Sequence, residues 1–275
     1  MTNDKFISDS FPRGDVVFID RARFRVDGLI HQGSDSRILS AHPIEGGGDS
    51  AFVIKEFSCR RGDDLWDDCL REIEAGLRLR RCRNILPLLG HSVRTDGVGN
   101  CDVFLLFERA ECLDGQSLSP DEVLNMCRDI LSALRYMKRR GLVHGDVKPA
   151  NIYRRRKKFL LGDLGSVIIS GQPARCVSRG YCAPEALRGE GCDFRSDLYA
   201  LGITCYRLLS GGRLPFCPIP CAEMTGTQVH AAIDRRLAGE PVPPIPGLPE
   251  EINSALLRMC EFSPDRRMLP KGFFS

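Results

Sequence analysis

The feature that most constrains this chain is a short charged stretch between apolar residues, Val-His-Gly-Asp-Val-Lys-Pro-Ala-Asn-Ile at positions 143–152. The Asp146 carboxylate could accept a proton from a hydroxyl, and Lys148, on the same side of an extended loop, could neutralise a phosphate. Asn151 offers an amide oxygen to a hard cation such as Mg²⁺. A second carboxylate follows at Asp163, in the tripeptide Asp-Leu-Gly. Together these groups are the parts that phosphoryl transfer requires.

The two motifs together resemble those of one protein family. Residues 143–152 resemble the catalytic loop of protein kinases, and Asp163-Leu164-Gly165 resembles the family's metal-binding Asp-Phe-Gly. Either motif alone would be modest evidence, because a lone Asp-Leu-Gly is more often an ordinary turn. Their order and spacing make a kinase-like fold the leading hypothesis, and the resemblance extends from about Phe24 to Met268.

Length and composition agree with this hypothesis. The 275 residues suffice for one large domain or two lobes, and 43% hydrophobic with 27% charged residues indicates a chain that buries a core. A net charge of +3 is too small to predict a specific nucleic-acid partner. No apolar run approaches the roughly 18 residues that span a bilayer, and residues 1–13 lack a signal-peptide core. We therefore expect a cytoplasmic protein without a membrane segment.

The cysteine content also bears on the compartment, because the chain has thirteen cysteines. No Cys-x-x-Cys pair occurs, and the five histidines are not spaced with the cysteines as metal ligands. We expect reduced, partly buried thiols in a reducing compartment. Cys217 and Cys221, separated by three residues in a proline-rich turn, leave a zinc or redox role open as the alternative.

The first third of the chain predicts strands around a phosphate-binding turn. A strand over 24–30 is followed by His-Gln-Gly-Ser-Asp-Ser-Arg-Ile at 31–38, a turn rich in small polar residues whose backbone N–H groups could face a phosphate. This turn resembles the kinase glycine-rich loop, Gly-x-Gly-x-x-Gly-x-Val. Only Gly33 is kept, and His31 and Ser36 replace the other glycines. A plain hairpin turn is the alternative.

A lysine and a glutamate in the same region form a predicted ion pair. Lys55 lies within an apolar strand over 51–57, where a charge is unfavourable without a partner. The resemblance implies that Lys55 holds the α- and β-phosphates of ATP and is oriented by Glu72, in a helix over about 65–80. A lysine that reaches solvent from an edge strand is the alternative.

The remaining chain predicts a helical region that presents the catalytic loop. Ser-Pro-Asp-Glu at 119–122 combines a cap residue, a proline at the first helical position and a capping box, and the helix that follows extends to about Gly141. Asp197, at the start of a second apolar helix, should need backbone N–H partners. The resemblance implies that Asp197 braces the catalytic loop. It also implies an activation segment that ends in Ala-Pro-Glu at Glu185, with Arg267 paired to Glu185.

The fold class expected from the resemblance is α+β, a two-lobed protein-kinase-like fold. ATP would lie in the cleft between a small antiparallel β lobe with one helix and a mainly helical lobe. The expected boundaries are an N-terminal extension at 1–23, a kinase domain at 24–268 and a tail at 269–275. Within the domain, the β lobe spans about 24–107, the hinge about 108–115 and the helical lobe about 116–268.

The resemblance also implies a role for each candidate site residue. The catalytic set comprises Asp146, Lys148, Lys55 and Glu72. The ATP-binding set comprises Ile30, Gly33, Ile38, Lys55, Phe107, Glu108, Ala110, Asn151 and Asp163, with Phe107 as the gatekeeper behind the adenine. The expected metal is Mg²⁺, with Mn²⁺ as an alternative, held by Asn151 and Asp163. Lys148, two residues after Asp146, is the pattern of serine/threonine-specific members, so the expected substrates are protein hydroxyls.

One departure from the family predicts how activity is regulated. His-Gly-Asp at 144–146 replaces the usual His-Arg-Asp, whose arginine would bind a phosphate on the activation segment. We therefore expect activity that does not require phosphorylation of this segment.

Two other functions remain open. His-Gly-Asp with a later aspartate also occurs in small-molecule kinases of the aminoglycoside and choline type, and the reduced glycine loop fits a pseudokinase that scaffolds partners. Two basic turns, one from Arg78 to Arg83 and one from Arg154 to Lys158, are either solvated faces or docking sites for an acidic partner.

Overall fold

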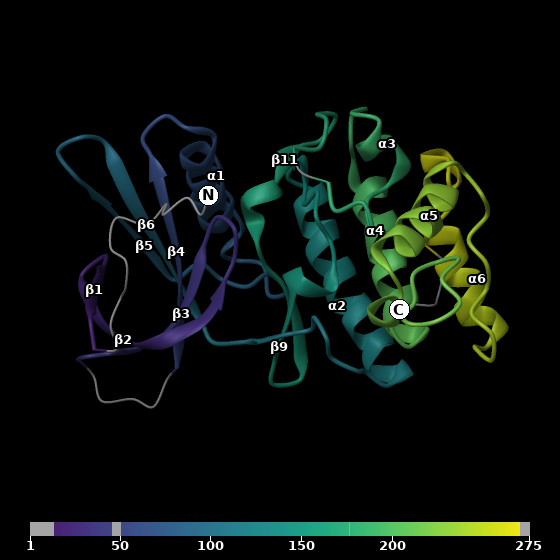
Figure 1. The fold of residues 1–275 in the computed structure, drawn as a ribbon, viewed down its shortest axis with the longest axis horizontal. Coiled ribbons are helices and arrows are strands. Elements are labelled where there is room, and N and C mark those ends of the chain that lie inside the picture. The colour runs from purple at the N-terminus through teal and green to yellow at the C-terminus, as the bar shows by residue number, and fades with distance from the viewer. Residues whose placement is uncertain (1–13, 46–50, 176, 270–275) are drawn as a thin grey trace. The chain divides into compact units, whose positions relative to one another are not determined.

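The computed structural model describes residues 14–45, 51–175 and 177–269, and these form two compact units (Figure 1). The first unit comprises the chain up to Arg81 together with Leu86–Ala110, and the second comprises Cys82–Ile85 with the chain from Glu111 onward. The second boundary lies between Ala110 and Glu111, and the hinge is predicted at about 108–115. Residues 82–85, which lie inside the range predicted for the β lobe, group with the second unit.

Backbone pairing explains why this short segment belongs to the second unit. The Asn84 carbonyl accepts a hydrogen bond from the Leu161 amide at 2.9 Å, and the Asn84 side chain donates to the Phe159 carbonyl at 3.4 Å. Ile85 also forms a parallel bridge with Leu161.

The first unit is built on a six-stranded antiparallel sheet in the order β1-β2-β3-β4-β6-β5 (Figure 1). Its strands are β1 (Val16–Ile19), β2 (Ala22–Gln32), β3 (Arg37–Pro43), β4 (Phe52–Arg60), β5 (Gly90–Thr95) and β6 (Asn100–Glu108). The sheet places Lys55 on β4, an interior strand between β3 and β6.

The sheet begins earlier than the sequence predicted. Residues 1–23 were expected to precede the fold, whereas β1 pairs with β2, in register from Val16 opposite Arg25 to Ile19 opposite Ala22. Val17 and Ile19 point into the core and are completely buried, because alternate residues of a strand face the same side. Residues 1–13 lie outside the described part of the chain.

The helix α1 (Asp64–Leu79) belongs to the first unit and covers one face of the sheet. Its first turn is capped by Asp63, whose carboxylate accepts from the Trp66 amide at 2.7 Å. Gly76 packs so closely on Leu88 that a Cβ there would lie 2.9 Å from the leucine side chain. This close contact fixes the helix on the sheet, and with it the position of Glu72.

The second unit is mainly helical, as predicted. Its helices are α2 (Pro120–Lys138), α3 (Pro184–Leu187), α4 (Phe194–Leu209), α5 (Gly226–Leu237) and α6 (Glu250–Met259). Its short strands are β7 (Glu111–Cys112), β8 (Leu142–Val143), β9 (Ile152–Arg155), β10 (Lys158–Leu161) and β11 (Ile168–Ile169). The predicted capping box is present at the start of α2, where Ser119 and Glu122 satisfy each other's backbone N–H groups.

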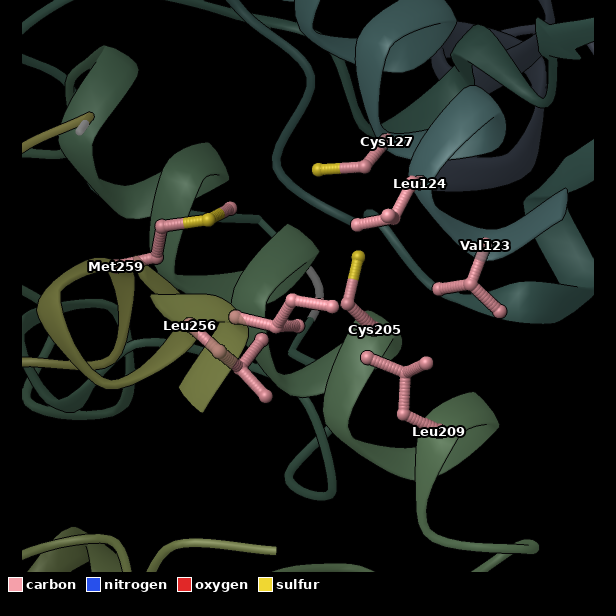
Figure 2. A pocket seen from close by; sticks show the side chains of 8 residues that line it. Val123, Leu124, Cys127, Cys205, Leu209, Leu256 and Met259 are labelled. Atoms are coloured by element: carbon pink, nitrogen blue, oxygen red, sulfur yellow. The ribbon is translucent and has the colours of Figure 1, made fainter. Parts of the chain in front are cut away.

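Helices α2, α4 and α6 meet around a small apolar pocket (Figure 2). Its lining residues are Val123, Leu124, Cys127, Cys205, Leu209, Ile252, Leu256 and Met259. Residues 196–206 of α4 are buried throughout, so this helix forms the core against which the catalytic loop rests. None of the helices in the described ranges is long and apolar enough to cross a membrane.

Candidate active site

The backbone of the predicted catalytic loop is held by one buried carboxylate. Asp197, in the first turn of α4, accepts hydrogen bonds from the His144 amide at 2.7 Å and the Gly145 amide at 2.9 Å. Burial raises the pKa of the Asp197 carboxyl, and the two amides and the nearby His144 partly offset this effect. The backbone partners predicted for Asp197 are therefore present, and both lie in the catalytic loop.

Asp146 has one oxygen engaged and one oxygen without a partner. Its Oδ2 lies 2.7 Å from Lys148 Nζ and accepts from Asn151 Nδ2 at 3.0 Å. Its Oδ1 is buried and has no hydrogen-bond partner among the described residues. A buried carboxylate oxygen without a donor is costly, and it is the kind of atom that receives a proton from a bound hydroxyl.

Asn151 is oriented by the same loop. Its Nδ2 donates to the Asp146 carbonyl at 2.8 Å as well as to the Asp146 carboxylate. Because the nitrogen is committed to Asp146, the amide oxygen is the atom that Asn151 can offer to a cation. Asn151 is buried, so its position is set by packing and not by solvent.

Asp163 is placed beside this loop by its neighbour in the chain. The Gly162 amide donates to the Asn151 carbonyl at 2.9 Å, and the Gly162 carbonyl lies 3.0 Å from Nε2 of His144. Asp163 itself has a left-handed backbone, with φ 55° and ψ 75°. A non-glycine residue in this conformation is uncommon and often marks a functional position.

Asn151 and Asp163 together offer hard oxygen ligands, an amide oxygen and a carboxylate, which suit Mg²⁺. No group of three or more His, Cys, Asp or Glu side chains in the described ranges could hold a metal ion. Asn151 and Asp163 supply two side-chain ligands, which fits a cation that keeps waters and phosphate oxygens as its other ligands, as Mg²⁺ usually does.

In the first unit, the predicted ion pair is present. Lys55 Nζ lies 3.0 Å and 2.9 Å from the two carboxylate oxygens of Glu72, and both side chains are largely buried. The Lys55 ammonium also lies 4.9 Å from the centre of the Phe57 ring. Because β4 is an interior strand and the pair is buried, the alternative of a solvent-exposed lysine on an edge strand is wrong.

The predicted glycine-rich turn is a closed hairpin turn between β2 and β3. The Gly33 amide donates to the Ser36 carbonyl at 2.8 Å, and a Cβ at Gly33 would lie 3.3 Å from that oxygen. On the same sheet, Ile38 is the direct cross-strand neighbour of Lys55. Ile30 is exposed at the end of β2.

The other predicted nucleotide-binding residues of this unit lie on β6 and directly after it. Phe107 packs against the core under α1, and its cross-strand neighbour on β4 is Val53. Glu108 ends β6, and Ala110 is the last residue of the unit. Asp146, Lys148, Asn151 and Asp163 belong to the second unit.

Comparison with known proteins identifies the family. A model of the protein kinase domain matches residues 24–273. The chain belongs to the protein kinase family. The match begins at the predicted residue 24 and continues past the predicted boundary at 268.

Several curated serine/threonine-protein kinases are similar to this domain. Serine/threonine-protein kinase PknJ of Mycobacterium tuberculosis is 27% identical over 180 residues, covering 60% of this chain and 29% of the relative. The probable serine/threonine-protein kinase SCO3848 of Streptomyces coelicolor is 32% identical over 167 residues, covering 56% and 23%. Inactive serine/threonine-protein kinase PLK5 of the mouse is 33% identical over 167 residues, covering 56% and 27%. The chain therefore spans less than a third of the length of each of these relatives.

The activation segment of this kinase domain is attached to the catalytic loop through a serine. Lys148 Nζ donates to Ser178 Oγ at 3.0 Å while it also contacts Asp146. The sequence analysis did not name Ser178 and did not predict this contact. The signal that could have indicated it is the position of Ser178 inside the predicted activation segment, three residues before Tyr181.

Arg236, on α5, holds the end of the activation segment and was missed entirely. It is almost completely buried, and its guanidinium donates to the carbonyls of Arg179 and Cys182 and to the Tyr199 hydroxyl, at 2.6–2.9 Å. Nothing in the local sequence distinguishes Arg236 from its exposed neighbour Arg235. Buried guanidinium groups need such partners, and only the fold shows where they are.

Glycine at position 145 fits the space that the loop leaves. Gly145 has φ 83°, and a Cβ there would lie 2.8 Å from the Ser166 carbonyl oxygen. An arginine at this position would therefore require both a strained backbone and a shift of the chain after Asp163. The local packing therefore suits the glycine found here and not the arginine of His-Arg-Asp.

Proposed function

We propose that this kinase domain transfers the γ-phosphate of ATP to serine or threonine hydroxyls of protein substrates. The observation that carries the proposal is the buried, unpartnered Oδ1 of Asp146 next to the Lys148 ammonium. A base for the hydroxyl proton and a cation for the transferring phosphate are thus held in one short loop.

Each of these side chains has a defined task in the proposed reaction. Asp146 accepts or orients the hydroxyl proton at Oδ1, while its Oδ2 holds Lys148 and Asn151 in place. Lys148, steadied also by Ser178, opposes the negative charge on the phosphate. Lys55, oriented by Glu72, binds the α- and β-phosphates.

The remaining predicted residues bind the nucleotide and the metal. When bound, Mg²⁺, or Mn²⁺ in its place, neutralises phosphate charge. Asn151 and Asp163 would hold it through their side-chain oxygens. The set proposed to contact the nucleotide in the first unit comprises Ile30, Gly33, Ile38, Phe107, Glu108 and Ala110.

Two alternative functions each have one observation in their favour. The incomplete glycine loop and the similarity to a relative named as inactive favour a nucleotide-binding pseudokinase scaffold. His-Gly-Asp favours a small-molecule kinase. The intact Lys55–Glu72 pair and the catalytic geometry around Asp146 oppose the first alternative, and the Lys148–Ser178 contact and the closing Ala-Pro-Glu oppose the second.

The test is transfer of radiolabelled γ-phosphate to a generic basic protein and to the chain itself in the presence of Mg²⁺. We expect label on serine and threonine with the wild-type chain and none with Asp163→Asn. Label on amino sugars or choline, with none on protein, would support the small-molecule kinase. Nucleotide binding without any transfer, in either Mg²⁺ or Mn²⁺, would support the pseudokinase.

We also propose that activity does not require phosphorylation of the activation segment, because Gly145 leaves no arginine to bind such a phosphate. Protein treated with phosphatase, and shown by mass spectrometry to carry no phosphate on residues 163–185, should transfer phosphate without a lag. A lag that disappears after incubation with ATP would contradict this. Serine replacement is the weaker test, because Ser178 contacts Lys148 and its loss would lower activity for another reason.

The proposed partners are protein substrates and, at the basic turns, an acidic surface. In the basic stretch from Arg154 to Lys158, Arg154 on β9 already pairs with Glu111 and Glu122. The cations offered to a partner are therefore those of the exposed Arg156, Lys157 and Lys158. The other turn, from Arg78 to Arg83, begins in the last turn of α1. The twelve described cysteines are free thiols, which supports a reducing, cytoplasmic location.

A further inference from the structure

Two thiols in the loop between α4 and α5 lie in contact. Cys217 and Cys221 are separated by Pro-Ile-Pro, and their sulfur atoms are 3.8 Å apart. Cys217 is 7% exposed and packs in the core with Tyr199 and Leu214, whereas Cys221 is partly exposed. The partly exposed cysteine of the pair therefore has a buried thiol as its immediate neighbour.

The backbone of the loop holds the two thiols together. The Cys217 amide donates to the Leu214 carbonyl at 3.0 Å, and the Cys221 amide donates to the Gly212 carbonyl at 3.2 Å. The Leu214 amide in turn lies 3.4 Å from Cys221 Sγ. Both cysteines are thus anchored to the same short segment, and the two intervening prolines restrict the chain between them.

This arrangement favours redox chemistry over zinc binding. A structural zinc site needs four ligands, and no group of three potential ligands occurs among the side chains that the structure describes. The sequence had left both roles open for this pair.

Other neighbouring thiols lack a solvent-exposed member. Cys127 and Cys205 interact across α2 and α4 at the apolar pocket of Figure 2, but both are about 2–3% exposed. In the first unit, Cys59 lies near Cys69 and Cys101, and all three are buried. Of the described thiols that lie beside another thiol, only Cys221 is partly exposed.

We propose that Cys217 and Cys221 form a redox modification site that closes to a reversible disulfide with a peroxide as the oxidant. The Cys221 thiolate attacks one peroxide oxygen, the O–O bond breaks, and Cys221 becomes a sulfenic acid with release of water. The Cys217 sulfur then attacks the Cys221 sulfur, so the S–S bond forms as the S–O bond breaks. The leaving hydroxide takes the Cys217 proton as a second water. Two thiols and one hydrogen peroxide thus give one disulfide and two waters.

Burial sets the order of the two steps. Burial, together with the neighbouring Cys221 thiol, raises the pKa of Cys217 to about 11, so Cys217 is the slower, resolving partner. The bond requires a sulfur–sulfur separation of about 2.0 Å, so the loop must tighten from its present contact. Tyr181, near the end of the activation segment, packs against the same core cluster. Tightening of the loop would therefore change the packing around Tyr181.

The test uses the full chain, treated with hydrogen peroxide, alkylated under denaturing conditions and digested with trypsin. Residues 214–235 form one tryptic peptide that contains these two cysteines and no others. We expect this peptide to be unalkylated and two hydrogen atoms lighter than its reduced form, and to regain both alkylation sites after dithiothreitol. Peptides with Cys127 and Cys205 should stay fully alkylated, which makes that buried pair the internal control.

Single variants separate the two steps of the proposal. Cys217→Ser should leave Cys221 as a sulfenic acid that dimedone captures, and Cys221→Ser should leave Cys217 as a free thiol. Oxidation of Cys221 in the wild type without loss of the Cys217 thiol would overturn the proposal, and so would earlier oxidation of Cys127 and Cys205. These readouts are chemical and do not depend on phosphate transfer, so they stand apart from the proposed kinase activity.

Discussion

Replacing Asp146 by asparagine is expected to lower the rate of phosphate transfer by about 10²–10⁴-fold, the usual contribution of a positioned general base. The amide has nearly the shape of the carboxylate but cannot accept the hydroxyl proton. Its oxygen can still accept from Asn151 and Lys148 at the position of Oδ2. Its NH₂ group then takes the position of Oδ1, the carboxylate oxygen that has no hydrogen-bond partner. The catalytic loop should therefore keep its structure while phosphate transfer slows.

Single-turnover transfer at saturating ATP measures this effect, because it reports the chemical step without product release. Nucleotide affinity and the midpoint of thermal unfolding should stay close to wild type. Asp121→Asn, at an exposed position in the first turn of α2, is the matched control and should transfer normally. A wild-type rate for Asp146→Asn would remove Asp146 from the proposed mechanism, and a large drop in the unfolding midpoint would show that its role is structural.

The parts of the site that could be predicted are those in which a local pattern implies a partner. Lys55 in an apolar strand requires an anion, and the helix that follows offers Glu72 at the matching position. Asp197 at an apolar helix start requires donors, and these proved to be the amides of His144 and Gly145. In both cases the energetic cost of an unpaired buried charge made the contact predictable.

The parts that could not be predicted depend on contacts between distant segments. The strand β1 has only four residues, and its pairing with β2 is what distinguishes it from an extension. Arg236 looks like any basic residue in the last turn of a helix until the activation segment is folded against it. The contact between Lys148 and Ser178 joins residues that are thirty positions apart, and no periodicity relates them.

The second large effect is expected on the free energy of unfolding. It arises at a buried ion pair whose two residues lie far from the catalytic loop in the sequence. Arg267 and Glu185 form two parallel contacts, at 2.5 Å and 2.7 Å, and both side chains are almost fully buried. Arg267 also donates to the carbonyls of Arg195, Glu261 and Phe262. It thereby ties the end of the activation segment to the segment after α6.

Arg267→Ala is expected to lower the free energy of unfolding by about 3–5 kcal/mol, because it leaves the Glu185 carboxylate buried without its partner. Urea titration followed by circular dichroism measures this loss. Arg188→Ala is the matched control, because Arg188 and Glu190 form an exposed pair in the same unit and such pairs contribute only about 0–1 kcal/mol. A loss for Arg267→Ala no larger than that of the control would contradict the prediction.

The dependence on pH separates a lost ion pair from simple loss of packing. Burial alone would raise the pKa of Glu185, but hydrogen bonds and the charge of Arg267 outweigh it and lower the pKa in the folded protein. In the wild type, the contribution of Glu185 is therefore present above its unfolded pKa of about 4.3 and is lost as pH falls through the lower folded value. In Arg267→Ala the charge and hydrogen bonds of Arg267 are gone, and only the Ser196 hydroxyl and a backbone amide still oppose the effect of burial. Because burial is the largest influence on this carboxyl, we expect the folded pKa to lie above the unfolded one, so that acid favours the folded state.

The stability difference between wild type and Arg267→Ala should accordingly be largest near neutral pH and shrink as pH falls toward 4. The double variant Glu185→Gln with Arg267→Met removes both charges and should be more stable than Arg267→Ala, because no buried charge is left unpaired. Two results would contradict this explanation: a stability difference that stays constant with pH, and a double variant that is no more stable than Arg267→Ala. Together they would mean that Arg267 stabilises the domain through its packing and carbonyl contacts. The charge of Glu185 would then contribute little.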